Sequence, residues 1–170
     1  YFENYHAQII MADCEPIYVP LVPPAFHFDP AVLEDAFKQN PKAILICNPS
    51  NPSGKVFTYE ELKLIADLCI KYDVYAIMDE VYEHIVFDGR RHESVLRWPE
   101  LRERAFVVSS FGKTYHCTGW KIGYCVAPPA LTAEFRKVHQ YNTFTTFAPA
   151  QHGFAAMIND EPQHHLELGA

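Results

Sequence analysis

Residues 43–80 read AILICNPSNPSGKVFTYEELKLIADLCIKYDVYAIMDE, and this stretch decides the fold. It begins and ends with continuous apolar runs, at 43–47 and 74–78, which are typical of strands buried on both faces of a sheet. Between them, Thr58 and Glu61 have the spacing of a capping box and predict the start of a helix. A strand, a helix and a second strand in this order predict two parallel strands joined by a crossover helix.

The same alternation continues on both sides of this unit. Asp29 and Pro30 open a segment with helical spacing, as an N-cap and a first helical residue. Short apolar runs at 7–11 and 17–19 precede it. We therefore predict an α/β domain with a mostly parallel sheet. The predicted elements are strands at 43–47, 74–78, 105–108 and 122–127 and helices at 30–39, 58–71, 129–141 and 148–158.

The composition fits one globular domain. The chain has 170 residues, of which 49% are hydrophobic, and this is enough for a buried core. The 14 basic and 21 acidic residues give a formal charge of -7, and the basic residues are scattered, so we expect no nucleic-acid partner. No apolar run reaches the roughly 20 residues of a membrane span, and the first residues lack the basic region of a secretion signal. We therefore expect a cytoplasmic protein without membrane contact.

The cysteines and histidines predict neither a disulfide framework nor a metal centre. The five cysteines are odd in number and form no CxxC pair, so we interpret them as free thiols in a reducing compartment. The nine histidines form neither an HxxxH nor an HExxH motif. We therefore expect no metal ligands in this chain.

Polar segments follow three of the predicted strands. In a sheet of parallel strands, ligands bind beyond the carboxyl ends of the strands. Here these ends lead into residues 48–54, 79–82 and 109–113, and all three segments carry polar residues that a structural loop would not require. The sequence therefore predicts a binding site where these segments meet.

Lys113 stands in a Gly-Lys-Thr sequence that resembles the end of a nucleotide phosphate-binding loop. Such a loop has a further glycine five residues before the last one, where this chain has Val107. A helix must also follow the lysine directly, whereas residues 118–120 interrupt it. A second Gly-Lys sequence ends at Lys55 and has Pro49 in place of the leading glycine. Both sequences therefore disfavour nucleotide binding.

A lysine at a strand end has another use, because its amine forms a Schiff base with a carbonyl and later transfers protons. The cofactor with the matching aldehyde is pyridoxal phosphate. It also requires a carboxylate near its ring nitrogen, donors near its phenolate oxygen and a phosphate site. Asp79 supplies the carboxylate, and Tyr82 and Asn51 supply the donors. Ser110 and Lys121 supply a hydroxyl and a cation for the phosphate.

Three segments of the chain resemble the landmark motifs of the class I/II aminotransferases, which are pyridoxal-phosphate enzymes of fold type I. Their spacing is similar as well, with 28 residues from Asn51 to Asp79. The resemblance implies a three-layer α/β sandwich with a mostly parallel sheet, in which residues 1–170 are a partial large domain. The three segments are NPSNPSG at 48–54, MDEVYEH at 78–84 and SSFGKTYHCTGWKIGY at 109–124.

The resemblance also implies a role for each residue of the site. Lys113 would form the Schiff base with the cofactor and move a proton between the cofactor and the α carbon of the substrate. Asp79 would keep the ring nitrogen protonated. Tyr82 and Asn51 would donate hydrogen bonds to the phenolate oxygen, and Ser110 would bind the phosphate. Lys113, Asp79 and Tyr82 would then be the catalytic residues.

Lys121 departs from the family pattern, which usually has an arginine eight residues after the Schiff-base lysine. Arginine binds a phosphate with two parallel hydrogen bonds, whereas lysine acts as a point charge, so we expect phosphate binding to survive in a looser form. Residues 115–128, YHCTGWKIGYCVAP, are similar to the methionine aminotransferase branch, which is related to the kynurenine and glutamine transaminases. The resemblance therefore implies transfer of an amino group from a methionine-like or aromatic L-amino acid to a 2-oxo acid.

Structural roles stay open for several of these residues. Asp79 could cap a turn, Tyr82 could be a core aromatic, and Asn48 and Asn51 could only form turns. If all of these residues had only structural roles, polar residues would follow three strands by coincidence. Packing or surface positions are favoured for three neighbours of the lysine, Trp120, Tyr124 and His116.

The resemblance implies that the chain is a fragment of a homodimeric enzyme of roughly 400 residues, which exceeds one domain of typical size. An amino-terminal segment and a carboxy-terminal small domain would be absent, and the chain alone would have weak activity or none. Other functions stay open, because one fold supports several reactions. They are a carbon–sulfur lyase, an enzyme similar to aminocyclopropane carboxylate synthase, and a catalytically silent fragment.

Overall fold

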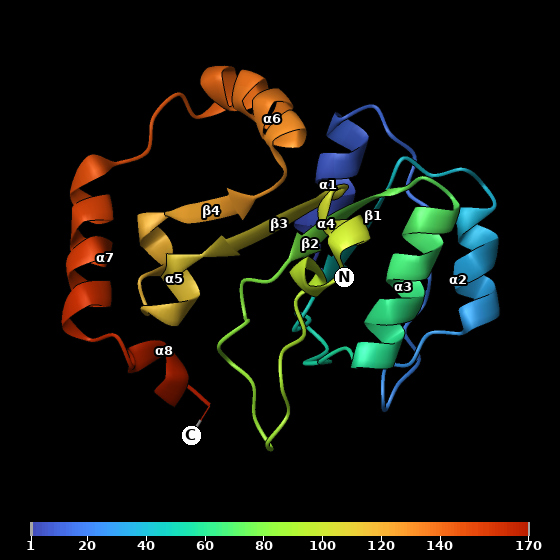
Figure 1. Cartoon of the computed structure of the whole chain (residues 1–170), viewed down its shortest axis with the longest axis horizontal. Coiled ribbons are helices and arrows are strands. Elements are labelled where there is room, and N and C mark those ends of the chain that lie inside the picture. Colours follow the sequence, from blue (N-terminus) through green and yellow to red (C-terminus); the bar gives the residue numbers. More distant parts are fainter. Residues whose placement is uncertain (1, 170) are drawn as a thin grey trace.

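The computed structural model describes residues 2–169 and has a four-stranded sheet at its centre (Figure 1). The first three strands are parallel, and the fourth runs antiparallel to the third. The sheet is therefore mostly parallel, which confirms the predicted α/β class. In order across the sheet, the strands are β1 (Ala43–Cys47), β2 (Tyr75–Asp79), β3 (Ala105–Ser110) and β4 (Gly123–Val126).

Helices connect the strands and follow them. The sequence predicts the starts of α2, α3, α6 and α7 to within one residue, but it predicts no helix where α1 lies. The helices are α1 (Asn4–Met11), α2 (Pro30–Phe37), α3 (Tyr59–Lys71), α4 (Pro99–Arg102), α5 (Phe111–Thr114), α6 (Pro129–Asn142), α7 (Ala148–Asp160) and α8 (His164–Glu167), with 3-10 turns η1 (Val95–Arg97) and η2 (Thr118–Trp120).

Side-chain caps begin the two helices that flank β1. In α3, Thr58 Oγ1 accepts a hydrogen bond from the Glu61 amide at 3.2 Å, and Glu61 Oε2 accepts one from the Thr58 amide at 2.9 Å. In α2, Asp29 Oδ1 accepts a hydrogen bond from the Ala31 amide at 2.8 Å. These bonds satisfy amides that have no partner in the first turn of a helix, which confirms both predicted caps.

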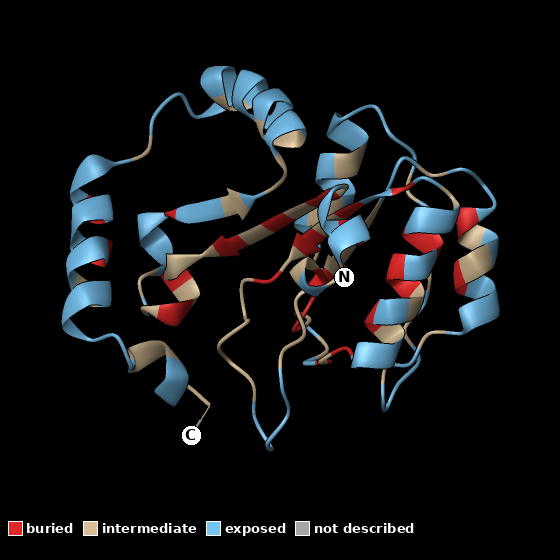
Figure 2. Ribbon diagram, viewed as in Figure 1, coloured by how far each residue is buried: buried red, intermediate tan, exposed pale blue. Residues whose placement is uncertain are grey.

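The core lies between the sheet and the helices α2, α3 and α4. Leu62 and Ile65 of α3, Met78 of β2 and Leu101 of α4 are at most 1% exposed. Figure 2 shows the buried residues gathered along the sheet and on the inward sides of α2 and α3, whereas α6 has no buried residue. Burial of each large apolar side chain stabilises the fold by about 1.5–3 kcal/mol. This core therefore holds β1 and β2, which lead into the candidate site.

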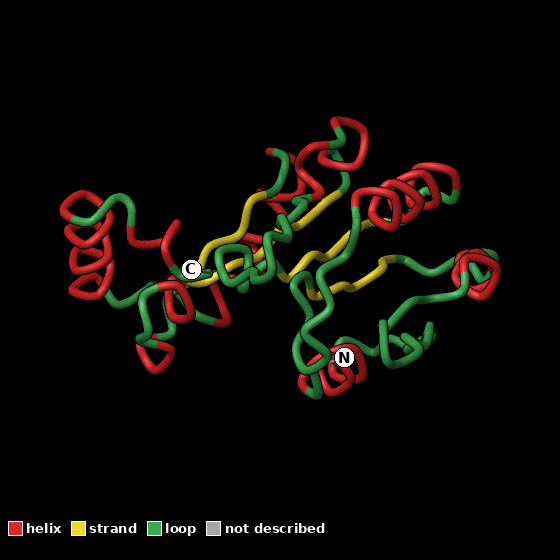
Figure 3. The backbone as a smooth tube through the Cα atoms, turned by 90° about the horizontal axis from the view of Figure 1, so that it is seen from below, coloured by secondary structure: helices red, strands yellow, loops and turns green. Residues whose placement is uncertain are grey.

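Helices cover both faces of the sheet. Viewed along its plane in Figure 3, α3 and α4 lie on one side and α1 lies on the other. This arrangement agrees with the three-layer sandwich that the sequence predicts. Because α1 crosses the second face, residues near the amino terminus come close to the carboxyl end of β2.

Covalent cross-links do not contribute to this fold. All five cysteines are free thiols, two of them buried at Cys47 and Cys69. The chain is therefore held by packing and hydrogen bonding. Among the described helices, none has both the length and the hydropathy that crossing a membrane requires.

Candidate active site

The carboxyl ends of β1, β2 and β3 lie side by side, and the predicted site residues follow them (Figure 1). Cys47 at the end of β1 pairs with Asp79 at the end of β2, and Asp79 pairs with Val108 of β3. The loop that carries Asn51 follows β1, and α5 with Lys113 follows β3 directly. Parallel pairing therefore gathers segments from three parts of the sequence at one edge of the sheet, as the sequence predicts.

Asp79 is partly buried and accepts two hydrogen bonds. Its Oδ2 accepts from the Tyr5 hydroxyl at 2.5 Å, and its Oδ1 accepts from the Val81 amide at 3.1 Å. Burial and then the bond to Asp79 raise the pKa of Tyr5 above its ordinary value, so this phenol stays a donor at neutral pH. The bond from the Val81 amide is the turn-capping contact that a purely structural role of Asp79 would predict. Each carboxylate oxygen still has capacity to accept from a further donor, such as a ring N–H.

Asn51, Tyr82 and Lys113 come together at these strand ends. Asn51 Nδ2 donates to the Tyr82 hydroxyl at 3.5 Å, and Lys113 Nζ lies 5.6 Å from the centre of the Tyr82 ring. Tyr82 is only partly buried, so it is not simply a core aromatic. An amide, a phenol and an amine from three strand ends can together bind an oxygen anion and place a reactive nitrogen near it.

Ser110 is the N-cap of α5, and Lys121 follows the 3-10 turn η2. Ser110 Oγ accepts a hydrogen bond from the Gly112 amide at 3.0 Å and donates one to the Ile122 carbonyl at 3.2 Å. Lys121 is exposed, has a left-handed backbone with φ of 56°, and precedes β4 by two residues. Gly123 of β4 pairs with Ser110, and Lys121 is two residues before Gly123, so the backbone of Lys121 passes near Ser110. A phosphate site shared by Ser110 and Lys121 stays a prediction.

Buried polar groups hold the loop that carries Asn51. Asn48 is fully buried, and its side chain bonds to two backbone groups at 3.0 and 3.2 Å. Lys55 Nζ donates to Glu61 Oε1 at 2.7 Å, and only 4% of the lysine side chain is exposed. Asn48 is thus a structural residue, and Lys55 is the partner of an ion pair. Neither is available for a ligand, and both fix the path of the chain on either side of Asn51.

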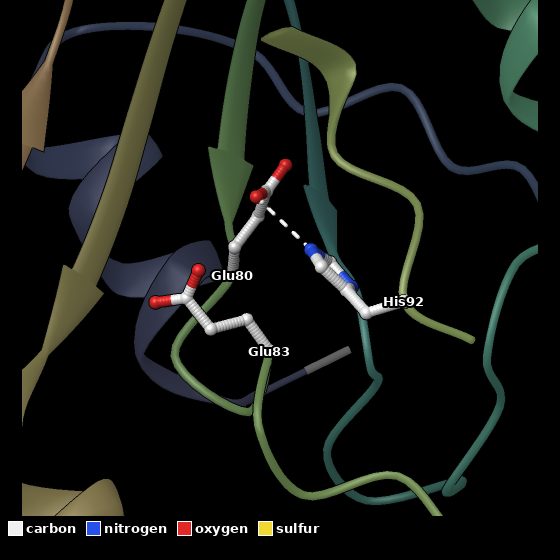
Figure 4. A group of neighbouring side chains, drawn as sticks. All are labelled: Glu80, Glu83 and His92. Atoms are coloured by element: carbon white, nitrogen blue, oxygen red, sulfur yellow. Dashed lines mark hydrogen bonds and ion pairs between the residues drawn. The ribbon is translucent and has the colours of Figure 1, made fainter. Parts of the chain in front are cut away.

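Glu80, Glu83 and His92 are close enough to one another to surround a metal ion (Figure 4). However, Glu80 Oε2 lies 3.1 Å from His92 Nε2, and Glu80 Oε1 accepts from the Val95 amide at 3.2 Å. Figure 4 shows the Glu83 carboxylate turned away from His92, and it accepts two hydrogen bonds from β3 and β4. Because protein donors already occupy both carboxylates, we interpret the Glu80 and His92 pair as an anchor for residues 84–94.

The chain is similar to known enzymes along almost its whole length. Residues 1–169 match the family described as aminotransferase class I and II. The chain belongs to the class I and II aminotransferases. A methionine aminotransferase from Escherichia coli is 42% identical over 167 residues, which are 98% of this chain and 43% of that protein. Kynurenine–oxoglutarate transaminase 3 from Bos taurus is 39% identical over 165 residues, which are 91% of this chain and 36% of that protein.

Solved aminotransferases confirm the fold. An Escherichia coli structure with methionine aminotransferase function superposes with a TM-score of 0.94 at 42% identity, covering 99% of this chain and 44% of that one. N-succinyldiaminopimelate aminotransferase from Mycobacterium tuberculosis superposes with a TM-score of 0.92 at 35% identity, with the same coverage. The chain therefore has the fold of a type I aminotransferase large domain and spans less than half the length of these relatives. Its predicted similarity to the methionine and kynurenine branches is confirmed.

The structure adds residues that the sequence patterns of this chain do not reveal. Tyr5 contacts Asp79 across 74 positions of sequence, so no local motif marks it. His116 and Trp120, two neighbours of Lys113, each lie near an aromatic ring of the carboxy-terminal segment. His116 is exposed and its ring lies 5.6 Å from that of His164, whereas the Trp120 ring lies 5.4 Å from Phe154 while 54% exposed.

Proposed function

We propose that this chain carries the cofactor site of a pyridoxal-phosphate-dependent aminotransferase. In the whole protein, the reaction would transfer an amino group from a methionine-like or aromatic L-amino acid to a 2-oxo acid. One observation carries the proposal: a carboxylate, an amide with a phenol, and an amine meet at three adjacent strand ends. The groups are those of Asp79, Asn51, Tyr82 and Lys113. Similarity to methionine and kynurenine aminotransferases supports the substrate class.

The donor set fits pyridoxal phosphate. When bound, this cofactor supplies an aldehyde that condenses with amines and a protonated ring that accepts the electron pair released at the substrate α carbon. Asp79 keeps capacity to accept from a ring N–H while Tyr5 and Val81 hold its carboxylate in place. Asn51 and Tyr82 present donors 3.5 Å apart, which is close enough to share one phenolate oxygen.

Lys113 has two tasks in this proposal. Its amine would hold the aldehyde carbon of the cofactor, and as a free amine it would move a proton to and from the substrate α carbon. The Tyr82 ring lies beside the Lys113 amine, with its centre 5.6 Å from Nζ. Tyr82 would therefore face the phenolate oxygen through its hydroxyl and Lys113 through its ring.

Lyase and synthase reactions on the same fold are the second candidates, but the relatives found are aminotransferases. A test that separates these reactions measures products with and without a 2-oxo acid. Transamination requires that acceptor, whereas elimination releases ammonia in its absence. We expect product formation only with the acceptor.

For the whole protein, we propose a cytoplasmic homodimer in which residues 1–170 form part of the large domain. The relatives are more than twice as long as this chain. Groups that recognise the substrate carboxylate would come from further sequence, so the 170-residue chain alone should transaminate weakly or not at all.

The proposal is tested by adding pyridoxal phosphate to the purified chain and recording its near-ultraviolet and visible spectrum. We expect an absorption band that is lost in Lys113→Ala. Lys137→Ala is a matched control, because Lys137 lies on the exposed helix α6 and, among residues 2–169, forms an ion pair only with Glu134, at 2.7 Å. A band that persists in Lys113→Ala, or that both variants reduce equally, contradicts the proposal.

A further inference from the structure

Glu83 links the turn after β2 to strands β3 and β4, next to the candidate site. Its Oε1 accepts a hydrogen bond from the Ser109 hydroxyl at 2.8 Å and another from the Tyr124 hydroxyl at 2.6 Å. Ser109 of β3 and Tyr124 of β4 are direct partners in the antiparallel register. One carboxylate oxygen therefore binds both members of a cross-strand pair from the turn that follows β2.

The surroundings of Glu83 shield one of these bonds from water. The Glu83 side chain is 22% exposed and the Ser109 residue 7% exposed, so little water competes for the Ser109 bond, whereas Tyr124 is 40% exposed and its bond lies nearer the solvent. Hydrogen bonds to an ionised group are shorter and stronger than bonds between neutral groups. Burial and then the bond to Glu83 raise the pKa of Tyr124 to about 12, so its hydroxyl stays a donor throughout the neutral range. His84 Nε2 lies 3.9 Å from Glu83 Oε1, and burial lowers the pKa of this histidine below its ordinary value, so the ring is neutral at pH 7.

Two of the three residues in this set are adjacent to residues of the proposed site. Glu83 follows Tyr82, and Ser109 precedes Ser110, which caps the helix that carries Lys113. The turn is also tied to β3 by the Glu80 amide, which donates to the Val108 carbonyl at 2.8 Å. The Glu83 carboxylate adds a side-chain tie to this backbone tie. The bond drawn in Figure 4 joins His92 to Glu80 and not to Glu83, so the Glu83 carboxylate is not a partner of His92.

We propose that Glu83 is a positioning residue, which sets the Tyr82 hydroxyl and ring relative to Lys113 by fastening the turn to Ser109 and Tyr124. This inference rests on the proposed function of Lys113. Without the carboxylate, the turn keeps its backbone bond but loses two side-chain bonds, so Tyr82 is free to shift away from Lys113. The expected consequence is weaker cofactor binding with little loss of folded structure.

The test compares Glu83→Gln with Glu134→Gln, in which the same exchange is made on the exposed helix α6. The first measurement is the pKa of Tyr124, obtained by nuclear magnetic resonance of isotope-labelled tyrosine. The Tyr124 signal is assigned by its absence in Tyr124→Phe. We expect Glu83→Gln to lower this pKa and Glu134→Gln to leave it unchanged. The second measurement is the titration of the Lys113-dependent absorption band with pyridoxal phosphate. The amide oxygen of glutamine can still accept from both hydroxyls, but it has no charge, so the weaker bonds should raise the apparent Kd several-fold in Glu83→Gln.

Tyr124→Phe guards against a folding defect, because it keeps the ring that lies 5.3 Å from Phe111 and removes only the hydroxyl. It should also weaken cofactor binding, by less than Glu83→Gln does. An unchanged Tyr124 pKa or an unchanged Kd in Glu83→Gln overturns the positioning role while the proposed function stands. If the unmodified chain shows no Lys113-dependent band, the proposed function fails, and the positioning role fails with it.

Discussion

Replacement of Glu61 by glutamine is expected to loosen the loop that carries Asn51. Glu61 Oε1 accepts from Lys55 Nζ at 2.7 Å, and its Oε2 accepts from the Thr58 amide at 2.9 Å. The side chains of Lys55 and Glu61 are only 4% and 15% exposed, and removal of one partner from a buried pair costs roughly 3–5 kcal/mol. The amide oxygen of glutamine retains one hydrogen bond, which contributes about 1 kcal/mol.

The free energy of unfolding should therefore fall by about 2–4 kcal/mol at neutral pH. In a chain of this size, such a loss lowers the Tm by roughly 4–16 °C. Urea unfolding followed by circular dichroism measures the change. The control is Asp67→Asn, which breaks the exposed Lys63–Asp67 pair on the same helix and should have a far smaller effect.

The effect of Glu61→Gln should depend on pH. Burial acts to raise the pKa of Glu61, but the hydrogen bonds from Lys55 and Thr58 outweigh it, so the pKa lies below its ordinary value. A carboxylate with a lowered pKa adds stability above its unfolded pKa, and this stability is lost as the pH falls through the folded pKa. The two proteins should thus differ most at neutral pH and converge well below about pH 4.3. A cost no larger than that of Asp67→Asn, or a cost that stays constant into acid, refutes the reasoning.

Three further substitutions probe the site and its support. Tyr5→Phe removes the 2.5 Å bond to Asp79 and should weaken pyridoxal phosphate binding about tenfold in a spectroscopic titration, and unchanged affinity would mean that Asp79 needs no such support. Asn48→Ala leaves two buried backbone groups without partners and should lower the free energy of unfolding by about 2–4 kcal/mol, measured by urea unfolding, whereas a loss below about 1 kcal/mol would argue against a structural role. Lys121→Arg should tighten cofactor binding several-fold in the same titration if this side chain reaches the phosphate, and no change would remove it from the phosphate site.

Elements with local signals could be predicted because the residues that form them are neighbours in the sequence. Thr58 and Glu61 are three positions apart and their capping box forms as expected, and Asp29 caps α2 in the same way. The strand ends could also be located, because polar residues follow each buried run. The direction of β4 could not, since an apolar run has the same composition whichever way it runs beside β3.

Contacts between distant segments account for what sequence patterns missed. Tyr5 lies on α1, where a short apolar run carries no helical signal, and it reaches Asp79 only because that helix covers the second face of the sheet. Glu83 contacts Ser109 and Tyr124 across 26 and 41 positions. Such contacts are consequences of the folded sheet. Motif spacing therefore locates the proposed chemical groups, while the residues that hold them emerge only from the structure.

The central claim is that Lys113 is the amine that reacts with pyridoxal phosphate. Borohydride reduction of the chain mixed with pyridoxal phosphate makes the bond between lysine and cofactor permanent. Peptide mapping then locates the modified lysine. The account predicts that the pyridoxyl group is found on Lys113 and that Lys113→Ala removes it without moving it to another lysine. Labelling spread over exposed lysines such as Lys63 and Lys137, with no preference for Lys113, would contradict the account.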